Sequence, residues 1–262
     1  MRRYFKLYLS FLRTALIREL AFRTSFIFNS ITSLIEIGIS LFGIEILFQN
    51  INSIAGWTFE ETLLVIGTQR IVHGFYFGLF IHNMAGIQRL VNQGRLDFVL
   101  TKPVDSQFLV STNRFQFYRV SHIISGVVIV ITSLKKLGLH VTPPNLLLYI
   151  LLLLSGVLIS YCLWFMTVLP AIRFTRLREI HEIFISLFQV TKFPPEIFKG
   201  FLRSLLTFVI PLMVIVIFPS KVLLGTLSVG FVLWSFAASL VLLYLSHRFW
   251  NFALKRYTSA GG

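Results

Sequence analysis

The sequence predicts an all-α membrane protein with about six transmembrane helices, an N-terminal amphipathic interfacial helix and a possible re-entrant outer segment. Of its 262 residues, 56% are hydrophobic and 13% are charged, and the mean hydropathy is +0.81. A soluble domain usually has about half apolar and about a quarter charged residues. The apolar residues also form long runs, which is typical of helices that cross a lipid bilayer. We therefore expect residues 1–262 to form a single transmembrane domain.

Residues 1–24 are predicted to form an amphipathic helix that lies on the membrane surface. Tyr4 and Phe11 fall on one face of this helix, whereas Lys6 and Arg13 fall on the opposite side. Such a helix inserts its apolar face at the boundary between headgroups and acyl chains. It is expected to anchor the orientation of the chain, and contact with a cytoplasmic partner is compatible with that role.

Five apolar segments are long enough to cross the membrane, because a helix needs about 20 mostly apolar residues to span about 30 Å. They are residues 25–48, 61–82, 115–134, 146–169 and 222–246. The third of them carries Arg119 and His122 near its start, which are expected at the interface or facing protein.

A sixth span is predicted before residue 222, and two layouts fit the sequence. In the first, residues 204–220 cross the membrane despite Pro211 and Pro219. In the second, a helix from about 174 to 193 crosses, and residues 194–220 dip back into the outer face as a re-entrant segment.

The distribution of basic residues predicts the orientation. The chain has 24 Lys and Arg and 10 Asp and Glu, a formal net charge of +14. In the first layout 20 of the 24 basic residues fall on one side of the membrane, and in the second layout 17 do against 6. The basic side is normally cytoplasmic, so both termini are predicted to be cytoplasmic. Because the basic residues lie between apolar runs, the charge indicates membrane orientation and not nucleic-acid binding.

Two ionisable residues are expected within the membrane, where a charge costs at least about 2.5 kcal/mol. Glu36 and Arg70 lie at similar depth in the first and second spans, and we hypothesise an ion pair between them. In the second span, Gly74 and Gly78 form a Gly-x-x-x-Gly pattern that permits close helix packing. Glu36 and Arg70 are expected mainly to hold helices together, with a direct role in substrate passage as the alternative, and the two glycines are expected to allow close packing.

The sequence contains no motif of a catalytic or metal site. It has no Gly-rich phosphate loop followed by Lys-Ser/Thr, so the chain is not expected to hydrolyse ATP itself. A Gly-x-Ser-x-Gly nucleophile turn is also missing. His181-Glu182 begins like a zinc-protease motif, but Ile185 stands where the second His is required. The one cysteine, Cys162, cannot form an intrachain disulfide.

The stretch between the second and third spans carries the most specific pattern. Residues 87–108 read IQRLVNQGRLDFVLTKPVDSQF. They are predicted to begin as a short amphipathic helix that turns at Gly94 and is stopped by Lys102-Pro103. In this context the stretch resembles a branch of the type-2 ABC exporter permeases. The matching residues are Gly94, Leu96, Asp97, Leu100, Lys102, Pro103, Val104, Gln107 and Phe108.

The resemblance continues through residues 193–225 and 252–262 and so covers essentially the whole chain. It implies a half-permease of six helices that pairs with a second permease subunit, identical or related, and binds two ABC ATP-binding subunits. It implies no cofactor in this chain, because ATP and Mg²⁺ are bound by the partner ATPase. The expected location is the lipid bilayer of the bacterial plasma (inner) membrane.

The resemblance also implies a site. Residues 83–114 would form the cytoplasmic coupling loop, which is seated in a cleft of the ATPase. The residues expected to contact the ATPase are Gly94, Leu96, Asp97, Lys102 and Pro103.

Two other classes of protein remain as alternatives. A membrane-embedded enzyme would use the intramembrane His and Glu residues and would turn over a substrate without ATP. An ion-coupled secondary transporter would more typically show inverted repeats and broken helices at mid-membrane, and the sequence has no convincing example of either.

Overall fold

The computed structural model describes residues 2–172 and 185–257, and the regular structure in these ranges is helical. Five helices are long and apolar enough to cross a membrane, or six if one bent pair is counted as a span. The predicted all-α membrane class is therefore confirmed. The five are α2 (Arg23–Asn50), α3 (Phe59–Tyr76) with its continuation, α7 (Val120–Lys136), α8 (Pro143–Val168) and α12 (Val229–Leu254).

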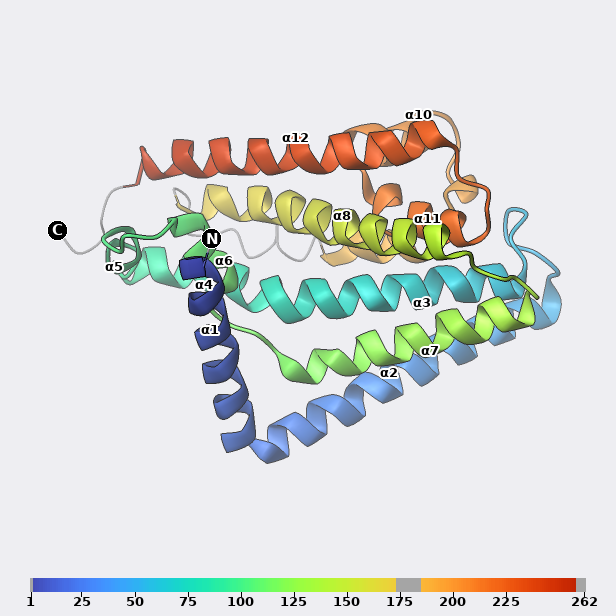
Figure 1. The fold of residues 1–262 in the computed structure, drawn as a ribbon, viewed down its shortest axis with the longest axis horizontal. Coiled ribbons are helices and arrows are strands. Elements are labelled where there is room, and N and C mark those ends of the chain that lie inside the picture. The colour runs from blue at the N-terminus through green and yellow to red at the C-terminus, as the bar shows by residue number, and fades with distance from the viewer. Residues whose placement is uncertain (1, 173–184, 258–262) are drawn as a thin grey trace.

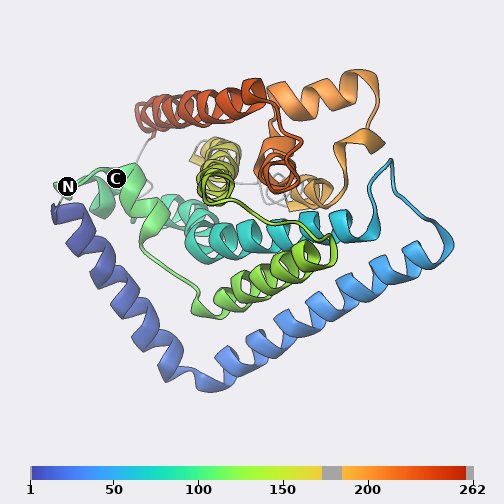
Figure 2. The same ribbon diagram turned by 45° about the vertical axis from the view of Figure 1, so that its right-hand side comes forward.

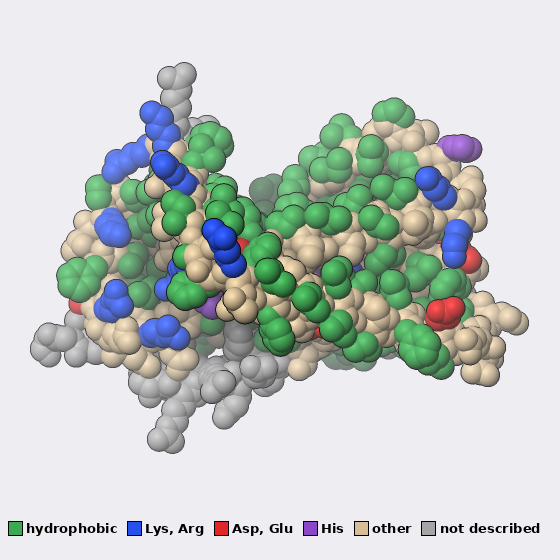
Figure 3. Space-filling model, turned by 90° about the horizontal axis from the view of Figure 1, so that it is seen from below, with side chains coloured by type: hydrophobic (Ala, Val, Ile, Leu, Met, Phe, Trp, Pro, Cys, Tyr) green, Lys and Arg blue, Asp and Glu red, His purple; other side chains and the backbone are tan. Residues whose placement is uncertain are grey.

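The bundle has two chemically different ends. Helices α3, α7, α8 and α12 run side by side, and α2 crosses them obliquely (Figure 1). Helix α1 (Arg2–Ala21), residues 93–119 and the C-terminal end of α12 lie at one end, which we call the basic end. The connections 51–58, 137–142 and 224–228 lie at the other, which we call the loop end. Figure 3 shows Lys and Arg side chains gathered towards one end of the molecule, beside a face covered mainly by hydrophobic side chains.

Helix α1 lies across the basic end, almost perpendicular to the bundle (Figures 1 and 2). Near its start, the Tyr4 ring packs edge-on against Phe108 with 5.1 Å between centroids. Near its end, the Glu19 carboxylate accepts a hydrogen bond of 2.8 Å from the main-chain N–H of Phe117. The predicted N-terminal helix is present, and it is attached at both ends to the segment that joins the second and third spans.

The second span is longer than the sequence pattern predicted. Helix α3 continues through the π-helical turn η1 (Phe77–Ile81) into α4 (His82–Asn92), giving 34 residues without a break. At 1.5 Å per residue this helix is about 50 Å long, well beyond the roughly 30 Å of the hydrocarbon core. The first ten residues of the predicted loop 83–114 are therefore a helical extension of the span itself.

Glycines allow the closest helix contacts. A methyl group added at Gly74 on α3 would lie 2.5 Å from Cγ1 of Ile123 on α7. A methyl group added at Gly126 would lie 2.7 Å from the carbonyl O of Gly67. At Gly78 the nearest atom would be 3.5 Å away, an ordinary contact. Of the two glycines in the predicted pattern, Gly74 is therefore the one at a tight crossing.

The segment before α12 folds back into the bundle. Helix α10 (Gly200–Ser204) and the π-helical turn η6 (Leu205–Val209) are followed by α11 (Leu212–Leu223), with a bend of 87° between the two parts. The first six residues of α11 are fully buried between α8 and α3. At the crossing with α8, a methyl group on Gly156 would lie 2.5 Å from the carbonyl O of Ile215.

Both ends of this segment lie at the loop end. The carboxylate of Glu196 accepts a hydrogen bond of 2.8 Å from Nζ of Lys221, and another of 2.8 Å from Nε1 of Trp57 in the 51–58 connection. A chain that starts and ends at one point does not cross the bilayer in between, so this geometry favours the re-entrant layout. Of the helix expected at about 174–193, residues 185–189 are helical and 173–184 lie outside the described residues.

Candidate functional site

The segment after α4 makes the predicted turn at Gly94. Gly94 has a φ of +64°, a conformation that glycine adopts without steric cost. The main-chain N–H groups of Arg95 and Leu96 then both donate to the carbonyl O of Leu90, at 2.9 and 3.1 Å. The Leu96 side chain is fully buried. Gly94 and Leu96 thus form the base of a compact reversal at the basic end.

The tip of this segment carries an aromatic residue that the sequence pattern did not single out. Helix α5 (Asp97–Leu100) follows the turn, and its Phe98 is 71% exposed. Lys102 and Pro103 are also exposed, whereas Asp97 is half-buried. The structure therefore brings the five predicted contact residues together, with Lys102 and Pro103 at the surface and Leu96 inside. A large apolar residue within a short polar loop was the available signal for Phe98.

Helix α6 (Ser106–Thr112) attaches this tip to two transmembrane helices. The Gln107 Nε2 donates to Tyr161 Oη on α8 at 3.0 Å and to Ser246 Oγ on α12 at 3.3 Å. The Gln107 Oε1 lies 3.0 Å from Nδ1 of His247, and Ser111 Oγ lies 3.0 Å from the same Tyr161 Oη. We call these five residues the Gln107 cluster. Gln107 was matched as part of the motif, and its role in the structure is to hold α6 against α8 and α12.

A second polar cluster lies where α2, α3 and the start of α7 meet. Arg70 is only 6% exposed. Its Nη2 donates to the main-chain carbonyl of Glu36 at 3.2 Å, and its Nη1 lies 3.4 Å from Nδ1 of His122. On the other side of that ring, Arg119 Nη1 and Ser33 Oγ lie 3.3 and 2.6 Å from Nε2. We call these five residues the Arg70 cluster.

Arg70 lies beside Glu36, as their similar depth in the two spans predicted. The interaction between them is not the hypothesised ion pair. The guanidinium binds the main-chain carbonyl of Glu36 and not its carboxylate. Among the described residues, the ion pairs within 4.0 Å are made by Glu196, not by Glu36. The depth argument located the neighbour correctly, but it could not show that Arg70 also reaches across to α7.

A cavity of about 490 Å³ opens beside the Arg70 cluster. Glu36, Arg70 and Arg119 line it together with Lys192, which lies in the turn η4 (Val190–Lys192). Within the described part of the chain, no group of three or more His, Cys, Asp or Glu residues is arranged to hold a metal ion. The lining can hydrogen-bond and attract negative charge.

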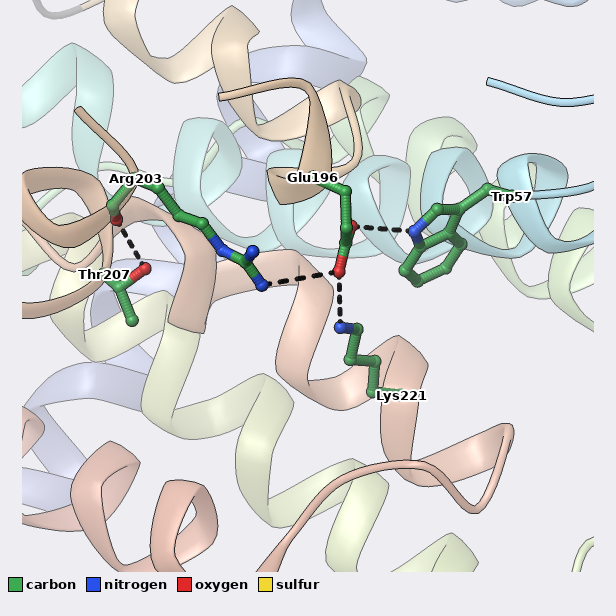
Figure 4. A network of polar contacts seen from close by, with 5 residues as sticks. All are labelled: Trp57, Glu196, Arg203, Thr207 and Lys221. Carbon is green, nitrogen blue, oxygen red and sulfur yellow. Dashed lines mark hydrogen bonds and ion pairs between the residues drawn. The ribbon is translucent and has the colours of Figure 1, made fainter. Parts of the chain in front are cut away.

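A third polar network closes the re-entrant segment at the loop end (Figure 4). Glu196 receives the hydrogen bonds from Lys221 and Trp57, and Arg203 Nη2 lies 3.8 Å from its Oε1. Partial burial alone would raise the pKa of Glu196, but the hydrogen bonds from Lys221 and Trp57 outweigh it. The pKa of this carboxyl group therefore lies below its usual range.

Comparison with known proteins identifies the family. Residues 34–261 match the family described as ABC-2 family transporter protein. Searches among curated proteins and among solved structures found no significant match. The matched range contains most of α2, all the later spans and the α5 tip. The chain therefore belongs to the ABC-2 family of transporter proteins and is a membrane permease component of an ABC transporter.

Proposed function

We propose that this chain is the permease subunit of an ATP-driven exporter, and that residues 94–103 dock into a separate ATPase subunit. The unbroken helix Phe59–Asn92 carries the proposal, because it joins the membrane interior at Arg70 directly to the α5 tip. A rigid helix transmits a displacement of its cytoplasmic end to the membrane-embedded part. The ATPase would bind ATP and Mg²⁺, and this chain would form the translocation path with a second permease subunit.

The orientation follows from the charge distribution. We place the basic end in the cytoplasm, because cytoplasmic segments of membrane proteins carry the excess of Lys and Arg. Both termini and the α5 tip then face the ATPase side of the bacterial plasma membrane. The re-entrant segment with Glu196 and Lys221 then lies at the outer face.

Phe98 is the proposed anchor of the docking surface. Phe98 is an exposed aromatic side chain at the tip, and aromatic residues are enriched in the cores of protein interfaces. The Gln107 cluster fixes α6 behind it, so that force on the tip reaches α8 and α12. Two routes thus connect the tip with the spans: α4 into α3, and α6 into α8 and α12.

Cysteine crosslinking tests the placement of the contact. In a Cys162→Ala background, cysteines at Phe98 and Lys102 are expected to crosslink to a co-expressed ABC ATPase. A cysteine at exposed Leu139, in the 137–142 connection at the loop end, is the matched control and should give no product. Crosslinks from residues 171–182 without any from 94–103 would show that the coupling contact has been misplaced.

Phe98→Ala tests the anchor itself. Because the side chain is 71% exposed, its removal should change the free energy of unfolding by less than about 0.5 kcal/mol. We expect ATPase recovery in an affinity pull-down from mild detergent to fall at least tenfold. Leu139→Ala, which also removes an exposed apolar side chain, should leave recovery unchanged. Full recovery of the ATPase with Phe98→Ala would remove Phe98 from the interface.

A further inference from the structure

The cavity beside the Arg70 cluster has more positive charge than its acids balance. Among the described residues that line it, Arg70, Arg119 and Lys192 are cationic and Glu36 is the single acid. These side chains come from α3, the residue before α7, η4 and α2, so four separate elements bring charge to one space. A charge at this depth is costly, and such residues normally face protein or a water-filled path.

The hydrogen-bond donors in this cluster also outnumber the acceptors. A neutral imidazole has one ring nitrogen that accepts and one that carries hydrogen. His122 can therefore accept from only one of the two arginines that approach its ring, Arg70 at Nδ1 or Arg119 at Nε2. In addition, Nε of Arg70 and Nε of Arg119 are buried and have no hydrogen-bond partner. The same lining also holds a buried acceptor without a partner, Gln189 Oε1, so the imbalance is a surplus of positive charge and guanidinium donors and not a complete lack of acceptors.

The rest of the lining is partly polar and partly apolar, and Ser40, Gln69, His73 and Gln189 are its polar members. Ile39, Phe77 and Ile185 line the cavity together with the cations. The cavity lies beside α2, which is the least buried of the five long helices and exposes Ile35, Ile39 and Phe42. A volume of about 490 Å³ is within the range of about 300–1,000 Å³ typical of small-molecule sites. A ligand here would find cations around its head and apolar surface for its tail.

We propose that this cavity binds the acidic headgroup of an amphipathic molecule, a phosphate or carboxylate attached to an apolar chain, as part of the translocation path. The acid supplies the acceptors that Arg70 and Arg119 lack, and the chain lies along the apolar side of α2. Arginine presents its donors in a planar fork that matches the oxygens of such groups. This assignment rests on the proposed function, because it gives the permease a class of cargo.

A binding experiment tests the site with two ligands that have the same apolar chain and differ only in the headgroup. The purified full-length permease in phosphatidylcholine nanodiscs is titrated with a pyrene-labelled dodecyl phosphate and with the pyrene-labelled alcohol of the same length. Binding is read from quenching of tryptophan emission. We expect the phosphate to bind at least tenfold more tightly than the alcohol. Equal affinity for the two would overturn the proposal.

Variants locate the binding. Arg70→Gln and Arg119→Gln should each weaken binding of the phosphate at least tenfold while leaving the alcohol unaffected. Arg203→Gln, which removes an exposed arginine at the loop end, is the matched control and should bind like the unmodified chain. If Arg70→Gln fails to fold, Lys192→Gln, on a half-buried lining residue, is measured in its place. Unchanged affinity in the cavity variants would place the ligand elsewhere.

Two further arms separate the possible explanations. Inorganic phosphate should compete only at concentrations far above those of the labelled amphipath. Competition at equal concentration would identify a free anion as the ligand and overturn the amphipathic class. Recovery of the ATPase without headgroup-selective binding would defeat this inference alone. Selective binding by a chain that never recovers an ATPase would instead defeat the proposed function.

Discussion

The Gln107 cluster and the Arg70 cluster are each centred on a buried polar side chain between helices, yet only one of them is balanced. In the Gln107 cluster the amide and Tyr161 are neutral groups whose donors and acceptors meet at 3.0–3.3 Å. In the Arg70 cluster two guanidinium groups share one imidazole and keep unpartnered nitrogens. Buried polar groups are normally satisfied, so a satisfied network indicates structure and an unsatisfied one indicates a missing partner.

The two clusters should therefore respond differently to substitution. Removing a member of a satisfied network leaves its partners buried without hydrogen bonds, which costs about 1–3 kcal/mol for each group. Removing Arg70 costs its hydrogen bond to the Glu36 carbonyl and its contact with His122, but it also removes a buried charge and an unpartnered Nε. Stability measurements on the two clusters, with the Glu196 network as an intermediate case, test this distinction.

Gln107→Leu should have the largest effect. The substitution removes the amide that donates to two buried hydroxyl groups, Tyr161 Oη and Ser246 Oγ, so we expect a loss of about 2–4 kcal/mol in the free energy of unfolding. Thermal unfolding in detergent measures it. Ser160→Ala is the matched control, because this buried hydroxyl bonds only the carbonyl of Gly156 in its own helix. Equal stability of the two variants would mean that the Gln107 cluster does not hold α6 in place.

Glu196→Gln should have an intermediate effect of about 1 kcal/mol at pH 7, since the ion pairs of Glu196 are partly exposed. Because the folded-state pKa of Glu196 is lowered, its contribution is present above the unfolded value of about 4.3 and is lost as pH falls through the folded value. Thermal unfolding of both proteins between pH 7 and pH 3 should show the stability difference shrinking in acid. A difference that stays constant with pH would show that the carboxylate charge is not involved.

The helices and the α5 turn were largely predictable, because they depend on local sequence. Hydropathy located five spans, and Gly94 marked a turn that requires a positive φ. The continuation of α3 through His82 into α4 was not predicted, because the change from apolar to polar residues looked like the end of a helix. A helix does not have to end where it leaves the lipid.

The polar clusters were harder to predict, because their members are far apart in the sequence. Gln107 bonds Tyr161 across 54 positions and Ser246 across 139, and nothing in the local pattern at residue 107 indicates either partner. The similar depth of Arg70 and Glu36 in their spans predicted that they are neighbours. The contact with His122 depends on which face of α7 points towards Arg70, and hydropathy does not define that rotation of the helix. Glu196 contacts Lys221, 25 residues further along the chain, only because the segment between them re-enters the bundle. The sequence allowed this re-entrant layout but also allowed a layout in which the segment crosses the membrane.

Arg70→Gln should have the smallest effect on stability, although it removes a buried charge in the middle of the membrane. The substitution gives up the hydrogen bond to the Glu36 carbonyl, but it also removes the unpaired Nε and the repulsion from Arg119 and Lys192. We expect the free energy of unfolding to change by less than about 0.5 kcal/mol, or to increase, since replacing buried ionic groups is often neutral or stabilising. Thermal unfolding alongside Gln107→Leu gives the comparison directly. A loss as large as that of Gln107→Leu would show that Arg70 holds the helices together, and the surplus of donors around His122 would then not indicate an absent anionic partner.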